Sequence, residues 1–342
     1  MVQKPTTIAQ VAAKAKVSQA TVSRVLNQPD IVKPELITRV NKAIKELGYR
    51  PNRHARALGG FSPISVGLVL FDDLKMFFSN PFWSTAMDSI YQSLLHNDME
   101  CNLILQSSKL PTLAHTGDVD SYAEFLRTRN VDGFIVVGHP SIDNEESFEK
   151  CNLPVVMWGR PTSKKSKLTY VESDNYAGAV LATEHLISKK RKRIAIITGR
   201  QDAPVSADRL HGYADALKKH NLPLDDLLIA HGDFSRNSGR ESMRILLDRN
   251  AMIDAVFASN DEMALGALDV LREKKIDVPK KISLIGFDNV DVDDDNHHFL
   301  STVSINYTQI GNDVVSAVLK GIKGQSYESH LVGVTLISRL SS

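Results

Sequence analysis

Long apolar runs are absent from this sequence of 342 residues, and cysteine is scarce. No segment reaches the roughly 18 consecutive apolar residues that a membrane-spanning helix needs. Residues 1–7 lack the apolar stretch of a secretory signal. The two cysteines, Cys101 and Cys151, fall in separate predicted α/β units, so buried reduced thiols are favoured over a disulfide. Together these absences predict a cytoplasmic protein.

Signatures of catalysis and of metal binding are missing as well. The sequence contains no G-x-S-x-G elbow, no P-loop and no zinc-binding H-E-x-x-H. The acidic stretch that starts at Asp291 is similar to a calcium loop, but Asn296 stands where that loop needs glycine and Thr302 where it needs glutamate. The adjacent His297 and His298 would point apart on a strand or loop. We therefore expect no catalytic residue, no metal and no cofactor.

The formal net charge of +1 conceals a marked asymmetry. The N-terminal segment 1–60 holds 11 lysines and arginines against three acids and carries +8, whereas the rest of the chain carries −7. A basic segment on an acidic body indicates contact with a polyanion such as nucleic acid. Charge alone leaves a solvated basic surface as the alternative.

Three short helical patterns fill this basic segment. Thr7 and Gln10 form a capping box, Ser18 is a good N-cap for a second helix, and a third helix runs from Pro34 until Gly48 stops it. Two short helices joined by a tight turn and braced by a third describe a helix-turn-helix. A three-helix module that binds protein is the alternative, and the charge of +8 disfavours it.

In such a motif the start of the second helix meets base edges in the major groove. Gln19 offers both a donor and an acceptor to one base, and Arg24 can form a bidentate pair with guanine. The hydroxyls of Thr21 and Ser23 suit phosphate oxygens. The predicted DNA-contacting residues of this segment are Thr7, Gln19, Ala20, Thr21, Ser23, Arg24 and Asn27.

Residues 49–60 follow, where Asn52 can cap a short helix that has little apolar surface of its own. Helices this short are marginal in water. The segment could become ordered on DNA, with Asn52, Ala55 and Leu58 as its predicted DNA-contacting residues and Leu58 as a wedge in the minor groove. It could equally be a flexible linker.

From Ile64 onward, short β-branched runs alternate with amphipathic helical stretches. The strand candidates include residues 66–71, 102–106, 133–137, 154–158, 193–198, 255–259 and 283–287. This alternation predicts parallel sheets with helices on both faces, which bind ligands at the carboxyl ends of their strands. The number of alternating strands and helices is larger than a single sheet usually contains, which favours two lobes with a cleft between them.

Polar residues close several of these strands. Asn260 and Asp288 each follow a strand candidate, Arg209 lies near a predicted helix start, and Phe234 could stack on the apolar face of a sugar. These residues suit a neutral polyhydroxyl ligand. The alternative is that the polar residues cap helices and that the phenylalanine belongs to the core.

The motifs of the basic N-terminal segment resemble the lactose/galactose repressor (LacI/GalR) family. The resemblance rests on TIAQVA at residues 7–12, VSQATVSRVLN at residues 17–27 and LGYRPN at residues 47–52. It implies an all-α helix-turn-helix domain over residues 1–50, a hinge helix and linker over 51–62, and a two-lobed periplasmic-binding-protein-like α/β core over 63–342. By position, Gln19, Ala20 and Arg24 correspond to the base-reading residues, and Leu58 to the hinge leucine. Ala20 and Lys33 depart from the family pattern.

The resemblance continues through SNDEMALG at residues 259–266 and ISLIGFD at residues 282–288. It implies effector contacts at Arg209, Asn260 and Asp288, with Phe234 as the stacking aromatic. WGRP at residues 158–161 and SDN at residues 173–175 are similar to the branch that senses maltose-type oligosaccharides, and NPFW at residues 80–83 would supply the wall of the other lobe. These motifs add four predicted effector-binding residues: Phe82, Trp158, Arg160 and Asp174. Ile305 departs from the family, because many members carry a ligand-binding glutamine there.

The sequence therefore predicts a repressor of sugar-utilisation genes that a sugar releases from a near-palindromic double-stranded DNA operator. The alternative within this class is a global regulator whose DNA affinity is raised by a ligand or a partner protein. A sugar transport component and an enzyme are the other classes considered. No heptad pattern follows the predicted core, so we expect a homodimer and not a tetramer. The sequence names neither the sugar, nor the operator, nor the regulated genes.

Overall fold

The computed structural model describes residues 8–27, 31–47, 63–71, 74–106, 119–249, 252–290 and 295–342. The chain divides into two compact units, Met1–Ile64 and Ser65–Ser342. The predicted hinge over residues 51–62, with Asn52, Ala55 and Leu58, lies outside the described residues, as does Thr7. No helix that the structure describes combines the length and the apolar character needed to cross a membrane.

The first unit is the predicted helix-turn-helix. It contains α1 (Ile8–Ala15), α2 (Gln19–Asn27) and α3 (Pro34–Leu47), whose core is built on Val11, Val22 and Val40, all fully buried. Ser18 caps α2 as expected, because its Oγ accepts a hydrogen bond from the Thr21 backbone N–H at 3.1 Å. The three helices thus enclose a small apolar core of their own.

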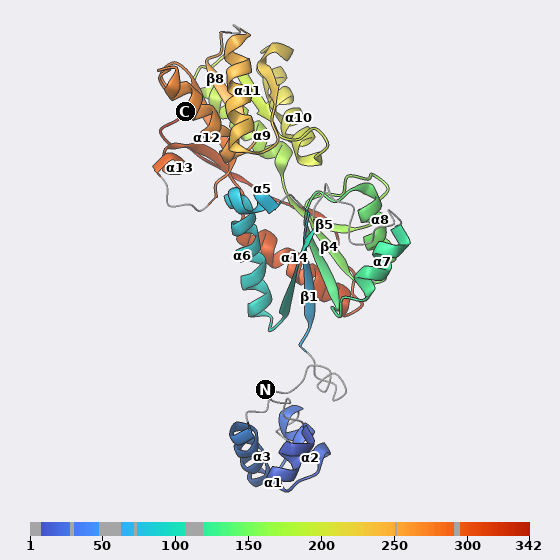
Figure 1. Cartoon of the computed structure of the whole chain (residues 1–342). Helices are drawn as coiled ribbons and strands as arrows, with labels where there is room; N and C mark the ends of the chain where they lie inside the picture. The colour runs from blue at the N-terminus through green and yellow to red at the C-terminus, as the bar shows by residue number, and fades with distance from the viewer. Residues whose placement is uncertain are drawn as a thin grey trace. The chain divides into compact units, whose positions relative to one another are not determined.

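The second unit has two lobes, each built on a six-stranded sheet (Figure 1). In the first lobe the strand order is β11 (His330–Val332), β5 (Thr169–Ser173), β4 (Val155–Trp158), β3 (Gly133–Gly138), β1 (Ser65–Phe71) and β2 (Glu100–Gln106), all parallel. Helices α7 (Val119–Arg127) and α8 (Ile142–Lys150) pack on one face. Helices α6 (Pro81–His96), preceded by the short α5 (Leu74–Ser79), and α14 (Tyr307–Ile322) pack on the other.

The second lobe repeats this layered arrangement. Its strand order is β12 (Thr335–Ile337), β10 (Ser301–Ser304), β9 (Ser283–Asp288), β8 (Ala255–Ala258), β6 (Ile194–Thr198) and β7 (Ile229–His231), and only β12 is antiparallel to its neighbour. Helices α9 (Asn175–Ser188) and α10 (Pro204–Lys219) cover one face, and α11 (Arg236–Asp248) and α12 (Asp261–Glu273) cover the other. A short 3-10 helix, η2 (Asp226–Leu228), precedes β7, and α13 (Asp295–Phe299) precedes β10.

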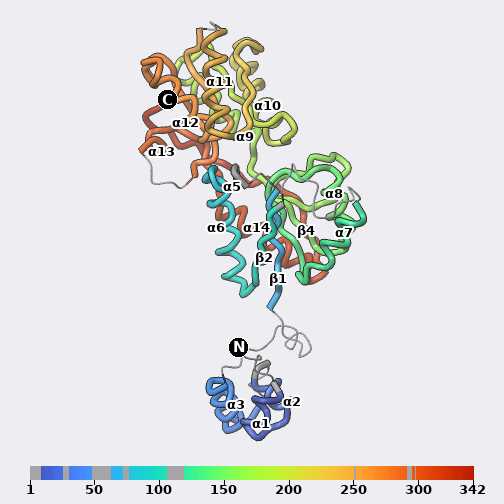
Figure 2. Tube along the Cα trace, in the orientation of Figure 1, coloured from blue at the N-terminus to red at the C-terminus, as the bar shows by residue number. Residues whose placement is uncertain are grey.

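The chain crosses between the lobes after β5, after β10 and after β11. As a result α14, which follows the second lobe in sequence, lies among the elements of the first lobe (Figure 2). Each strand candidate from the sequence overlaps an observed strand, and the two-lobed parallel α/β fold is confirmed. The sequence candidates omitted β5, β7, β10, β11 and β12, which have three to five residues each.

Close packing of α11 on α12 generates a stability prediction. A Cβ added to Gly266 would lie 2.0 Å from the backbone oxygen of Arg236, so the helices would have to separate. Gly333 has open space around the same position and serves as the control. We expect Gly266→Ala to lower the free energy of unfolding by about 1–3 kcal/mol, and Gly333→Ala to leave it nearly unchanged. Thermal unfolding would measure both, and equal midpoints would contradict this packing argument.

Candidate functional site

The exposed face of α2 is the first candidate site. Gln19, Ala20 and Arg24 are exposed, whereas Thr21 and Ser23 are half-buried. The Thr21 hydroxyl lies 2.9 Å from Ser18 Oγ and so already has a partner in the helix cap. The side chain of Asn27 lies outside the described set. Helix α2 has no acidic residue, and it exposes an amide at Gln19 and a guanidinium at Arg24, the types of group that read base edges.

A cavity of about 450 Å³ is the second candidate site, and it lies between the lobes at the carboxyl ends of their strands. Predicted effector residues that line it are Phe82, Trp158, Arg209, Phe234, Asn260 and Asp288. Ile305, which replaces the glutamine of many family members, also lines it. This volume falls within the range of small-molecule sites, which is roughly 300–1,000 Å³.

Arg160 and Asp174 are not among the residues that line the cavity. The Arg160 guanidinium instead binds the carboxylate of Asp208 on α10, so it joins the first lobe to the second. Asp174 caps α9 by accepting a hydrogen bond from the Ala177 N–H at 2.9 Å. The Arg160 side chain is engaged in an ion pair between the lobes and the Asp174 side chain in a helix cap, and neither lines the cavity.

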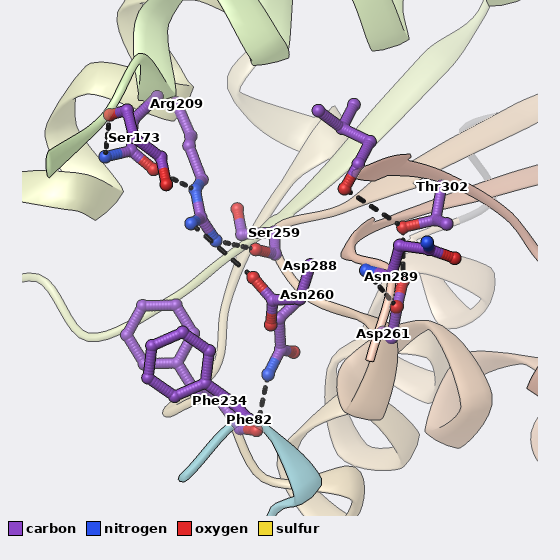
Figure 3. A network of polar contacts seen from close by, with 12 residues as sticks. Phe82, Ser173, Arg209, Phe234, Ser259, Asn260, Asp261, Asp288, Asn289 and Thr302 are labelled. Carbon is purple, nitrogen blue, oxygen red and sulfur yellow. Dashed lines mark hydrogen bonds and ion pairs between the residues drawn. The ribbon is translucent and has the colours of Figure 1, made fainter. Parts of the chain in front are cut away.

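Arg209 forms the floor of the cavity, and its side chain is almost fully buried. Its Nε donates to Asn175 Oδ1 at 2.9 Å, and its Nη1 donates to the backbone oxygen of Ser259. Its Nη2 lies 3.8 Å from Asp288 Oδ1 (Figure 3). The guanidinium carbon lies 3.7 Å from the Phe287 ring centroid. Burial raises the pKa of Asp288, and the positive charge of Arg209 acts in the opposite direction.

The turn that carries Asp288 has an unusual backbone. Asp288 has φ of 114° and Asn289 has φ of 51°, and conformations of this kind cost about 1–3 kcal/mol each. Asp261 holds the turn, since its Oδ2 accepts from the Asn289 N–H at 2.8 Å and its Oδ1 accepts from Thr302 Oγ1 at 2.6 Å (Figure 3). Burial raises the pKa of Asp261 to about 7, and these hydrogen bonds oppose that shift. Strain held in place beside a cavity is a mark of function.

Phe234 is held in a second strained turn, with φ of 73°. Asn260 Nδ2 donates to the backbone oxygen of Phe234 at 2.9 Å, while Asn260 Oδ1 caps α12 by accepting from the Met263 N–H at 2.9 Å. The Phe234 ring lies over Gly199, where an added Cβ would come within 2.0 Å of it. Asn260 therefore does act as a helix cap, and the same side chain fixes the aromatic ring at the cavity.

The first lobe contributes an aromatic wall. Asn80 caps α6 by accepting from the Phe82 N–H at 3.0 Å, which sets Phe82 and Trp83 at the cavity. The ring centroids of Phe82 and Trp158 lie 6.4 Å apart, and Tyr307 packs against both at 5.9 and 6.1 Å. Phe82 and Trp158 pack edge to face and Tyr307 packs tilted against both, so the three rings support one another.

Several polar residues at the cavity escaped the sequence reasoning, namely His139, Glu172, Ser173, Asn175, Arg200 and Asp233. His139 directly follows β3, and Glu172 lies on the short strand β5. Burial lowers the pKa of His139 to about 4, and the nearby Arg200 acts in the same direction, so the imidazole is neutral at pH 7. His139 could have been found from the sequence, because ligand-binding residues are expected directly after the carboxyl ends of strands and His139 follows β3. Glu172 could have been found only if residues Thr169–Ser173 had been identified as a strand.

One buried polar atom without a hydrogen-bond partner among the described residues belongs to the cavity lining, Glu172 Oε2. Two more, Ser259 Oγ and Tyr307 Oη, belong to residues that contact the lining. Ser259 provides the backbone oxygen that binds Arg209, and Tyr307 packs on the aromatic wall. Leaving such a group unpaired costs about 1–3 kcal/mol, which points to a ligand-binding site.

Known protein families match parts of both units. Residues 7–52 match the model of bacterial regulatory proteins of the lacI family, and residues 183–342 match a periplasmic binding protein-like domain. The HTH-type transcriptional regulator CelR of Thermobifida fusca is 33% identical over 324 residues, covering 94% of this chain and 93% of CelR. The HTH-type transcriptional repressor CytR of Escherichia coli K12 is 32% identical over 339 residues, or 98% and 96% of the two chains.

This chain is also similar to a solved structure over nearly its whole length. The transcriptional regulator CelR in complex with cellobiose is 31% identical, covers 98% of this chain and all of its own, and superposes with a TM-score of 0.73. With a helix-turn-helix that matches the family model and full-length relatives above 30% identity, the chain belongs to the LacI family of bacterial transcriptional regulators.

Proposed function

We propose that this chain represses sugar-utilisation genes in the cytoplasm and leaves its operator when an oligosaccharide occupies the cavity between its lobes. In this proposal Gln19 and Arg24 read base edges, Ala20 makes apolar base contact, and Leu58 acts as the hinge wedge in the minor groove. The cavity binds its ligand without turnover.

One observation carries the sugar assignment: stacking rings and buried hydrogen-bonding groups face the same cavity. Phe234 and Trp158 offer apolar planes to the ring faces of a sugar, while Arg209, Asn260 and Asp288 offer hydrogen bonds to its hydroxyls. Few ligand classes other than carbohydrates combine apolar faces with so many hydroxyl groups. The similar protein CelR is known in complex with cellobiose, which supports glucose disaccharides as first probes.

The cavity also suggests how binding reaches the DNA. Trp158 belongs to the first lobe and Arg209 to the second, so one ligand touches both. A ligand that binds one lobe arrangement better shifts the population toward it, by no more than its difference in affinity for the two. The ion pair between Arg160 and Asp208 also joins the lobes and would adjust with them.

A second copy of the chain would complete the DNA reader, and the first lobe offers a face for it. Tyr91 and Leu95 on α6 and Leu103 and Leu105 on the edge strand β2 are large apolar side chains with 45–49% of their surface exposed. A contiguous apolar face at a sheet edge is typical of an isologous interface. We assign the homodimer contact to this face, whose residues we call the α6–β2 face.

The α6–β2 face predicts the effect of a charge on oligomeric state. We expect Leu103→Asp to convert the dimer to a monomer and to lower operator affinity at least tenfold, because dimerisation would bury an unpaired carboxylate from each copy. Leu331→Asp, on the opposite edge strand and 49% exposed, is the matched control and should remain dimeric. Sedimentation equilibrium would measure both proteins. A dimeric Leu103→Asp protein would place the interface elsewhere.

Base reading by Arg24 predicts a loss of specificity. On operator DNA selected from a random pool, we expect Arg24→Ala to lose about 1–3 kcal/mol of binding free energy. Arg24→Lys keeps the charge but loses the bidentate geometry, so it should lose sequence discrimination while its affinity for random DNA stays unchanged. Competition binding at fixed salt would measure both. Equal discrimination by Arg24→Lys and the unaltered protein would exclude this base contact.

The repressor proposal is tested by operator affinity with and without cellobiose, maltose and other sugars. We expect one sugar to weaken operator binding at fixed salt. Phe234→Ala should raise the concentration of that sugar needed for release by about 10- to 100-fold, since a buried phenylalanine contributes about 1.5–3 kcal/mol. Phe299→Ala, a half-buried aromatic away from the cavity, is the control. A sugar that tightens operator binding would favour the co-repressor alternative, and no effect of any sugar would reject the sugar effector.

A further inference from the structure

We propose that Glu172 sets the specificity of this cavity: its Oε2 accepts a hydrogen bond from one ligand hydroxyl, and its charge rejects sugars that carry phosphate or carboxylate. This inference rests on the proposed sugar-binding function and names the chemistry that the ligand presents to the first lobe.

Glu172 lies at the wall of the cavity, on β5. Only 2% of its surface is exposed. Its Oε1 accepts a hydrogen bond from the Arg160 backbone N–H at 3.2 Å, whereas its Oε2 has no hydrogen-bond partner among the described residues. Buried carboxylate oxygens are normally paired, so an unpaired one at a cavity wall indicates a partner that arrives with the ligand.

A purely structural role for this carboxylate is disfavoured by comparison with Glu145. Glu145 is equally buried, and both of its oxygens are used: they accept from the backbone N–H groups of Thr162 at 2.6 Å and of Ser163 at 3.0 Å. That pattern is how this fold employs a buried glutamate to hold a loop. Glu172 accepts a backbone hydrogen bond with one oxygen only, from Arg160 in the loop that follows β4. Its other oxygen remains available to a ligand.

The charges around Glu172 decide which ligand class fits. The two arginines that line the cavity each face a carboxylate, since Arg200 forms an ion pair with Asp202 and Arg209 lies beside Asp288. Glu172 adds a carboxylate that forms no salt bridge among the described residues; burial raises its pKa, and the nearby positive charge of Arg160 acts in the opposite direction. An anionic sugar would be repelled there in a medium of low dielectric constant. A neutral sugar hydroxyl would instead donate a charge-assisted hydrogen bond.

Calorimetric binding to the full chain tests this proposal, with cellobiose, maltose and the monodeoxy analogues of whichever disaccharide binds more tightly. We expect one deoxy analogue to bind the unaltered protein about 10- to 100-fold more weakly than its parent. Glu172→Gln should weaken the parent by a similar factor and show no further loss with that analogue. The unaltered protein should also bind the 6-phosphate of the disaccharide at least 100-fold more weakly, an expectation that needs no variant.

Glu145→Gln is the matched control, because it alters a buried glutamate outside the cavity: thermal stability should fall while the ranking of the analogues stays the same. If Glu172→Gln binds the parent and every analogue as the unaltered protein does, or if the 6-phosphate binds as well as the parent, the proposal is overturned and the sugar-binding function stands. If the unaltered protein binds none of these sugars, the proposed function falls, and this proposal falls with it.

Discussion

A buried guanidinium needs its charge and its N–H groups satisfied, and the second lobe is organised around this requirement at Arg209. Its partners come from three separate elements: Asn175 at the start of α9, Ser259 after β8, and Asp288 at the end of β9. Losing any one of them would leave a buried charge poorly paired, which is among the costlier defects in a protein. Because the partners stand at strand ends, satisfying Arg209 also builds the floor of the cavity.

The sequence predicted correctly those features that depend on a pattern repeated over many residues. Alternating strands and helices predicted the two-lobed fold, and the polar residues expected after strand ends, Asn260 and Asp288, do line one cavity. It was less informative about the partners of single side chains: Arg160 pairs with Asp208 from a distant segment, and Asp174 caps the helix that it precedes. The strands it omitted are short, and their pairing comes from tertiary context more than from periodicity. Glu172 was overlooked for that reason.

The uneven distribution of charge assigns different tasks to the two units. Lysines and arginines outnumber acids in the N-terminal segment 1–60, and acids outnumber them in the rest of the chain. Phosphates attract the first segment and repel the body, so association with DNA is directed to the helix-turn-helix. Within that unit α2 contains no acidic side chain, and Gln19 and Arg24 are exposed, as the proposed base contacts need.

Coupling between the units depends on which ligand contacts change when the lobes move. The floor around Arg209 and the Phe234 turn belong to one lobe and hold each other in place, so they contribute the same affinity in every lobe arrangement. Contacts of that kind tighten binding without shifting any equilibrium. The differential affinity has to come from groups across the cavity, whose distance from the floor varies with the lobe angle. Trp158 and Glu172 are such groups, so the side chains that we propose to select the ligand are also those through which the ligand would act on DNA binding.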